Sequence, residues 1–117
     1  MEDLLLALRA VGQSTRLRIV AILARSELTV TELCRVLGQT QPRVSRHLRL
    51  LCEAGLLDRN AQGTSAFYRP ARLGRGRELF DAILPLLDDD DVGLQSDLRR
   101  LAAIRAERAA AAAAYFE

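Results

Sequence analysis

The side chains best suited to recognition chemistry lie in one short segment, QPRVSRHLRLL at residues 41–51. On a helix, the apolar residues Val44, Leu48 and Leu51 fall on one side. The residues that fall mostly on the other side are polar, apart from one proline: Gln41, Pro42, Ser45, Arg46 and Arg49. Glutamine can pair with adenine and arginine with guanine in the major groove of DNA, and serine can bond to bases or phosphates. A helix that reads base pairs is therefore predicted, and a solvated surface face is the alternative.

Further candidate DNA contacts surround this segment. LLDR at 56–59 and SAFYR at 65–69 are typical of short strands, and NAQGT at 60–64 supplies turn residues, which together predict a β-hairpin. Such a hairpin could touch phosphate or enter the minor groove. The remaining DNA-binding candidates are Thr40, Arg43, His47, Arg59, Gln62, Thr64 and Arg69. Of these, His47 lies beside the apolar stripe, so a structural hydrogen bond is favoured over a base contact.

Two helices joined by a short turn would position the recognition segment. Thr29 and Glu32 have the spacing of a capping box, which begins the first helix. The turn Gly-Gln-Thr at 38–40 ends that helix, and its threonine can cap a second one that runs to about Ala54. Pro42 is tolerated in a first turn because its missing amide had no helical partner. This pattern predicts a helix-turn-helix.

Apolar periodicity predicts further helices on either side. Residues 3–11 form one, Ser14 is expected to cap the next, and another spans about 77–87 with a kink or early end at Pro85. A last helix starts at Leu94. The predicted fold is mainly α: a winged helix-turn-helix of about five helices and a two-stranded hairpin wing, with an extra C-terminal helix.

The charge distribution divides the chain into unequal parts. The whole sequence carries a net charge of +2, but residues 1–80 carry +6 and residues 81–117 carry −4. A polyanionic partner is therefore expected for the first part only. We expect a DNA-binding and dimerisation domain at 1–87, an acidic linker at 88–93 and a C-terminal helix at 94–117.

Several phrases of the sequence resemble one known family. STRLRIV at 14–20 is similar to the family phrase DPTRLRIL, and TELCRVLGQTQPRVSRHL at 31–48 is similar to LAxxLGLSQSxVSRHL. Together with GLL at 55–57, they resemble the ArsR-type winged helix-turn-helix repressors over about residues 4–87. The resemblance implies a homodimer that binds double-stranded operator DNA with dyad symmetry. It also implies that the protein leaves the DNA when an effector, not identified by the sequence, binds to it. By position, the resemblance implies that four residues contact bases: Gln41, Pro42, Ser45 and Arg46. It places Arg49 near the DNA backbone. The expected dimerisation residues are Leu4, Leu5, Leu8, Leu79, Phe80, Ile83, Leu84 and Leu87.

Other kinds of site find little support in the sequence. In the family's thiolate metal site, Cys34 matches the first position but Val36 occupies the second, and His47 is the only histidine, so no metal site is expected. A thiol switch at Cys34 and Cys52 is the alternative to two buried structural thiols. No catalytic motif, and hence no enzyme activity or cofactor, is expected in this chain. The sequence holds no membrane span and starts with an acidic N-terminus, which predicts a protein of the cytoplasm and the bacterial nucleoid.

Three alternative functions remain open at this point. Residues 99–117 resemble the connector that links an ArsR-type domain to an S-adenosylmethionine-dependent methyltransferase, and S-adenosylmethionine would then bind only to that further C-terminal domain. In that case the chain is the DNA-binding regulatory module of a larger enzyme. A cysteine-based redox-sensing repressor and a protein-binding winged helix are the other two.

Overall fold

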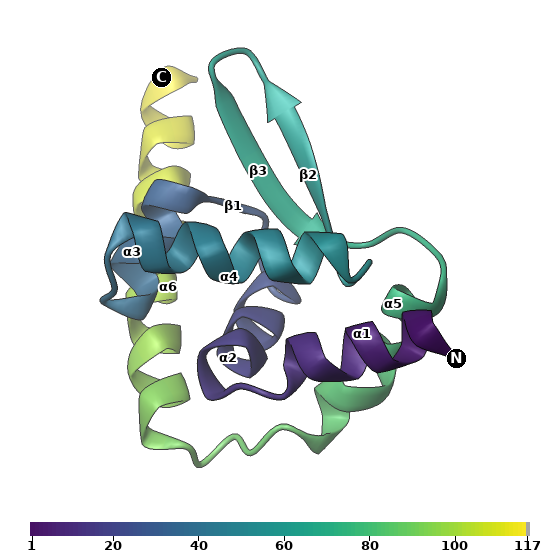
Figure 1. Ribbon diagram of the computed structural model, residues 1–117. Coiled ribbons are helices and arrows are strands. Elements are labelled where there is room, and N and C mark those ends of the chain that lie inside the picture. Colours follow the sequence, from purple (N-terminus) through teal and green to yellow (C-terminus); the bar gives the residue numbers. More distant parts are fainter. Residues whose placement is uncertain (117) are drawn as a thin grey trace.

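The helix-turn-helix lies at the centre of the structure, a computed structural model that describes residues 1–116 (Figure 1). Its two helices are α3 (Val30–Leu37) and α4 (Gln41–Glu53). The predicted capping box is present: the hydroxyl of Thr29 accepts from the Glu32 amide at 3.2 Å, and the Glu32 carboxylate accepts from the Thr29 amide at 2.9 Å. Gly38 ends α3 at φ 65°, which glycine adopts without steric cost. The predicted helix-turn-helix is therefore confirmed.

The other helices flank this unit, and their bounds are α1 (Glu2–Val11), α2 (Ser14–Leu23), α5 (Arg75–Ile83), the short 3₁₀ helix η1 (Leu84–Leu86) and α6 (Val92–Tyr115). The early end predicted at Pro85 is confirmed, because α5 gives way to the 3₁₀ turn there. The prediction that Ser14 caps α2 is wrong. The cap is Gln13, whose side chain accepts from the Arg16 amide at 2.9 Å.

The wing is a three-stranded antiparallel sheet rather than the predicted two-stranded hairpin. The strands β1 (Leu28–Thr29), β2 (Leu57–Gln62) and β3 (Ser65–Pro70) lie in the order β1-β3-β2. Strand β1 was not predicted, because two residues, the second of which is the helix cap Thr29, carry no periodicity. The turn is also shorter than predicted: Gln62 pairs with Ser65, so only two residues turn. Gly63, at φ 61°, supplies the positive φ that such a turn requires.

One apolar core holds these elements together. Val44, Leu48 and Leu51 anchor α4 and are completely buried, as their helical spacing predicts. The cluster that surrounds them comes from the other elements and includes Ile19, Ile22, Leu33, Val36, Leu56 and Phe80. Because α4 buries this stripe completely, the exposed side chains on its opposite face remain available to a partner.

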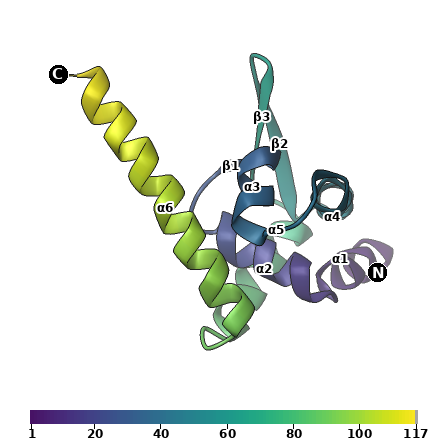
Figure 2. The ribbon, with the colours of Figure 1, turned by 90° about the vertical axis from the view of Figure 1, so that its left-hand side faces the viewer.

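Helix α6 packs along α2 and α3, and its last turns continue past them (Figure 2). It begins two residues earlier than predicted, because the carboxylate of Asp91 accepts from the Leu94 amide at 2.8 Å and caps the helix. Leu94, Leu101 and Ile104 are buried against the domain. Among residues 1–116, no helix combines the length and the apolar character that crossing a membrane needs.

Candidate DNA-binding surface

The outer face of α4 presents mainly polar side chains. The exposed residues at its start and along this face are Thr40, Gln41, Pro42, Arg43, Ser45, Arg46 and Arg49. Within the described part of the chain, neither Arg43 nor Arg46 makes an ion pair, and Arg49 lies 3.8 Å from Glu53. The guanidinium groups of Arg43 and Arg46 are thus available to bind phosphates or bases.

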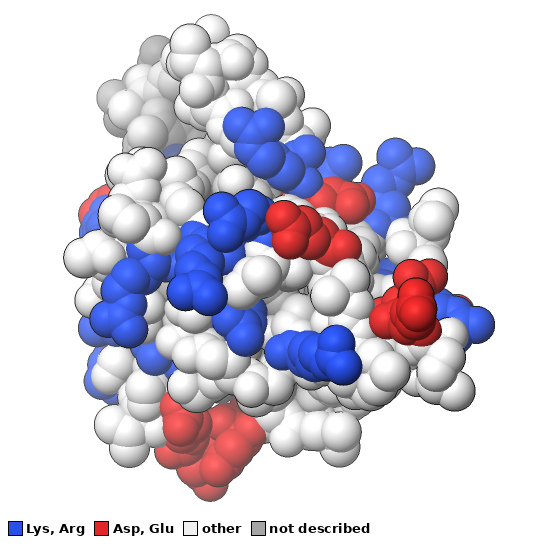
Figure 3. All heavy atoms as spheres, viewed as in Figure 1, with Lys and Arg blue, Asp and Glu red and all other residues white. Residues whose placement is uncertain are grey.

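Basic side chains predominate on the side of the molecule where α4 lies (Figure 3). Figure 3 shows basic atoms spread over the face where α4 lies and toward the wing. One group of acidic atoms lies at the lower edge, below α1 and α2, where the exposed residues 88–91 precede α6, and others lie beside the basic atoms and at the right-hand side of Figure 3. A polyanion would therefore be attracted to the α4 face and repelled from the α6 turn.

The wing places its candidate residues in two different environments. Arg59, Gln62 and Thr64 are exposed on β2 and the turn. Arg69 instead lies nearer the base of β3, where its guanidinium is 3.9 Å from Glu27 and only 30% of its side chain is exposed. The first three are suited to contact DNA, whereas Arg69 already has an acidic neighbour.

His47 lies at the edge of the α4 face and makes the kind of structural hydrogen bond that its position predicted. Its Nδ1 is 3.2 Å from Nη1 of Arg16 on α2. Since a guanidinium only donates, Nδ1 accepts and the neutral ring carries its proton on Nε2. Burial lowers the pKa of His47 below its ordinary 6.5, and the charges of Arg16, Arg43 and Arg46 lower it further. Sequence reasoning missed Arg16, which is 31 residues away and gives no local signal.

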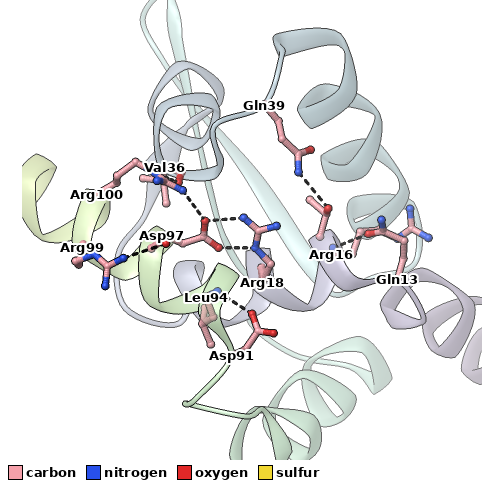
Figure 4. Close-up of polar contacts among 12 residues, drawn as sticks. Gln13, Arg16, Arg18, Val36, Gln39, Asp91, Leu94, Asp97, Arg99 and Arg100 are labelled. Carbon is pink, nitrogen blue, oxygen red and sulfur yellow. Dashed lines mark hydrogen bonds and ion pairs between the residues drawn. The ribbon is translucent and has the colours of Figure 1, made fainter.

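A buried ion pair fixes α6 behind the helix-turn-helix (Figure 4). Arg18 of α2 donates from Nε and Nη2 to the carboxylate of Asp97 at 2.6 and 2.7 Å. Asp97 is completely buried, and Arg100 lies 3.2 Å from it while donating to the Val36 carbonyl at 2.6 Å. The hydrogen bond to Asp97 raises the pKa of Arg18. Sequence reasoning did not find this cluster either.

Two further arginine–carboxylate pairs extend this contact along α3. Arg108 of α6 binds the Glu32 carboxylate at 2.6 and 2.7 Å, and Arg35 binds that of Glu107 at the same distances. Glu32 therefore serves both the capping box of α3 and the attachment of α6. These ion pairs thus fix helix α6 along α3, the first helix of the helix-turn-helix.

The candidate dimerisation residues divide between surface and core. Leu5 and Leu8 of α1 are exposed, and so is Leu6, which sequence reasoning did not select. Five other candidates are partly buried: Leu4, Leu79, Ile83, Leu84 and Leu87. Phe80 is 1% exposed and belongs to the core of the protomer, so it offers no surface to a partner. The apolar surface of α1 thus centres on Leu5, Leu6 and Leu8.

Both cysteines are free thiols in partly buried positions. Burial raises the pKa of Cys34, and it raises that of Cys52 from the ordinary 9.0 to about 11. A thiol switch needs a lowered pKa, so these environments argue against one. Within residues 1–116, no three histidine, cysteine or acidic side chains come together as a metal site would require.

The raised pKa of Cys52 predicts slow alkylation. In the Cys34→Ser protein at mildly alkaline pH, we expect iodoacetamide to modify folded Cys52 about 100-fold more slowly than the denatured chain, because two pKa units lower the thiolate fraction by that factor. Mass spectrometry measures both rates. The Cys52→Ser protein, which keeps Cys34, is the matched control. Equal rates for folded and denatured Cys52 would make this thiol a redox candidate again.

Comparison with known proteins assigns the chain to a family. The model described as "Bacterial regulatory protein, arsR family" matches residues 13–59, which contain α2 and the helix-turn-helix. Over 62 residues the chain is 47% identical to the arsenical resistance operon repressor of Escherichia coli (strain K12), covering 52% of this chain and 53% of that protein. The chain spans about half the length of the first curated relatives it matches.

Solved structures agree with this assignment. A possible transcriptional regulator for arsenical resistance is 32% identical, with a TM-score of 0.55 over 71% of this chain and 86% of that one. The homodimeric winged helix-turn-helix DNA-binding domain of a possible ArsR-family regulator from Mycobacterium bovis is 26% identical, with a TM-score of 0.64 over 73% and 78%. The expected fold class is confirmed, and the chain belongs to the arsR family of bacterial regulatory proteins.

Proposed function

We propose that this protein is a homodimeric transcriptional repressor that binds operator DNA and leaves it when an effector binds. The exposed polar face of α4 carries this proposal, because it presents glutamine, serine and two arginines that make no ion pair with the described residues, on a helix anchored by a fully buried stripe. The relatives named above include a repressor and a homodimeric DNA-binding domain. The chain would act at the nucleoid, in the bacterial cytoplasm.

Each protomer would insert α4 into a major groove, with Gln41, Ser45 and Arg46 facing base edges. Arg43 and Arg49 would contact the flanking phosphates, and the wing would add contacts from its exposed tip. Pairing through the exposed leucines of α1 would place two such helices on half-sites about one helical turn apart. An operator with dyad symmetry follows from that arrangement.

Base reading by α4 predicts a loss of affinity in two single variants. Arg46→Ala and Gln41→Ala should each weaken binding to DNA from upstream of the protein's own gene by about 1–3 kcal/mol, since each removes a contact to a base edge. Fluorescence anisotropy at physiological salt, with excess non-specific competitor DNA, measures the effect.

Arg105→Ala is the matched control, because Arg105 is an exposed arginine of α6 without a polar partner in the described residues. It should bind as the wild type does. If competitor DNA abolishes binding equally in all four proteins, only generic attraction between arginine and phosphate remains, and the repressor proposal is wrong.

A further inference from the structure

The first turn of α2 is a junction between elements that are distant in sequence. Its cap, Gln13, is separated from the end of α1 by Gly12 alone. The buried hydroxyl of Thr15 accepts from the Gln39 side chain of the helix-turn-helix turn at 3.3 Å (Figure 4). One turn later, Arg18 binds Asp97 of α6. The junction thus contacts the turn that precedes α4, and it contacts helix α6, which lies behind α3.

Arg16 is the residue of this junction that reaches α4 itself. Its Nε donates to the Ala10 carbonyl near the end of α1, and its Nη1 donates to Nδ1 of His47. The Ala10 carbonyl belongs to the last turn of α1, where carbonyls have no partner within the helix. One guanidinium therefore joins the C-terminal end of α1 to the middle of α4.

The position of His47 on α4 suits such a connection. It lies between the buried stripe, which includes Val44 and Leu48, and the exposed face, which includes Arg43 and Arg46. The hydrogen bond to His47 therefore fixes α4 from the side and leaves the polar face free for another molecule. Arg16 contacts the ring, and the charges that lower the pKa of His47 are all cationic: Arg16 from α2, and Arg43 and Arg46 from α4.

We infer that Arg16 is a positioning residue, which ties the recognition helix to α1 through His47 and so sets the angle at which α4 meets DNA. This inference rests on the proposed function. If two protomers pair through α1, the contact between Arg16 and His47 also fixes the distance between the two α4 helices. A change in how the α1 helices pair would then shift the position of α4 through the Arg16 side chain.

The test uses binding of the intact chain to a duplex from upstream of its own gene. Arg16→Leu and His47→Leu should each weaken binding about tenfold, because each leaves one partner of a half-buried hydrogen bond unpaired. The double variant should bind no more weakly than Arg16→Leu alone, since the contact between Arg16 and His47 is already lost in that single variant. His47→Asn, which keeps an acceptor near the place of Nδ1, should recover most of the affinity.

Two variants separate positioning from a direct contact with phosphate. Arg16→Lys keeps the charge but lacks the planar fork, so it should bind as weakly as Arg16→Leu. The dependence of log K on log salt should keep its slope in Arg16→Leu, whereas loss of a phosphate contact would lower that slope by about 0.9. A lowered slope, or normal affinity in Arg16→Lys, would overturn the inference. Arg105→Leu is the matched control for removal of one exposed charge.

NMR of the single histidine reports the contact without DNA. At neutral pH the wild-type ring should carry its proton on Nε2, and its titration midpoint should lie below 6.5. Arg16→Leu should move that midpoint upward, because a facing cation and a donor to the neutral ring are both removed. If the wild type binds no DNA specifically, the proposed function fails and the inference with it. If the wild type binds DNA specifically, but Arg16→Leu changes neither the titration midpoint of His47 nor the affinity for DNA, only the inference fails.

Discussion

Replacing Gly76 with alanine should destabilise the protein by about 3 kcal/mol or more, because it forces backbone apart in a packed interior. Gly76 is the second residue of α5 and is buried against the turn that leads from α4 into β2. A Cβ at this position would lie 1.9 Å from the carbonyl oxygen of Gly55 and 2.8 Å from the amide nitrogen of Leu56. No rotamer change relieves a clash with backbone atoms. Such a loss is a large share of the roughly 5–15 kcal/mol that stabilises a typical domain.

Gly93 provides a matched control, since it is the second residue of α6. An alanine Cβ there would meet only side chains, at 3.2 Å from the Asp91 carboxylate and 3.6 Å from the Arg18 guanidinium. Gly93→Ala should therefore stay within about 1 kcal/mol of the wild type, with higher helix propensity offsetting the tight contact. Urea unfolding followed by circular dichroism, at one protein concentration, gives both values. Equal stability of the two variants would show that α5 can shift away from Gly55.

Removing the carboxylate of Asp97 should cost about 3 kcal/mol, which is typical when one partner of a buried ion pair is lost. Asp97 is completely buried, and Arg18 is only 21% exposed, so water can replace little of the lost interaction. Asp97→Ala also leaves Arg100 without its carboxylate partner, although its bond to the Val36 carbonyl remains. Helix α6 should consequently detach more readily from α2 and α3.

Two further variants test whether charge or packing causes that loss. Arg18→Met with Asp97→Leu replaces the pair by apolar side chains and should recover most of the stability, as such replacements often do. Asp81→Ala breaks an exposed pair with Arg77 and should cost less than about 1 kcal/mol. Urea unfolding compares the four proteins. If Asp97→Ala is as mild as Asp81→Ala, the buried pair does not attach α6.

Local signals in the sequence were sufficient to predict the helix-turn-helix and its orientation. The capping box at Thr29 and the turn at Gly38 each depend on residues within four positions of one another. The stripe of Val44, Leu48 and Leu51 gave the inner face of α4, and therefore the outer one. The candidate residues on that outer face follow from the same periodicity.

Contacts between distant residues could not be predicted in this way. Helical spacing selects Phe80 as apolar, but only the tertiary structure shows that it faces the core rather than a partner. The hairpin is longer than predicted because cross-strand pairing carries the polar residues of 60–62 into the strand. The partners of Arg16 and Arg18 lie 31 and 79 residues further along the chain, where no local pattern indicates them.

The attachment of α6 also bears on the kinetics of folding. Its ion pairs join residues that are 72, 76 and 79 positions apart, whereas α3 and α4, like β2 and β3, are neighbours in sequence. Loop-closure entropy delays contacts of such long range, so the helix-turn-helix and the wing can form before α6 docks. Interactions that form after the transition state mainly slow unfolding. Helix α6 therefore governs how long the native fold persists more than how quickly it is reached.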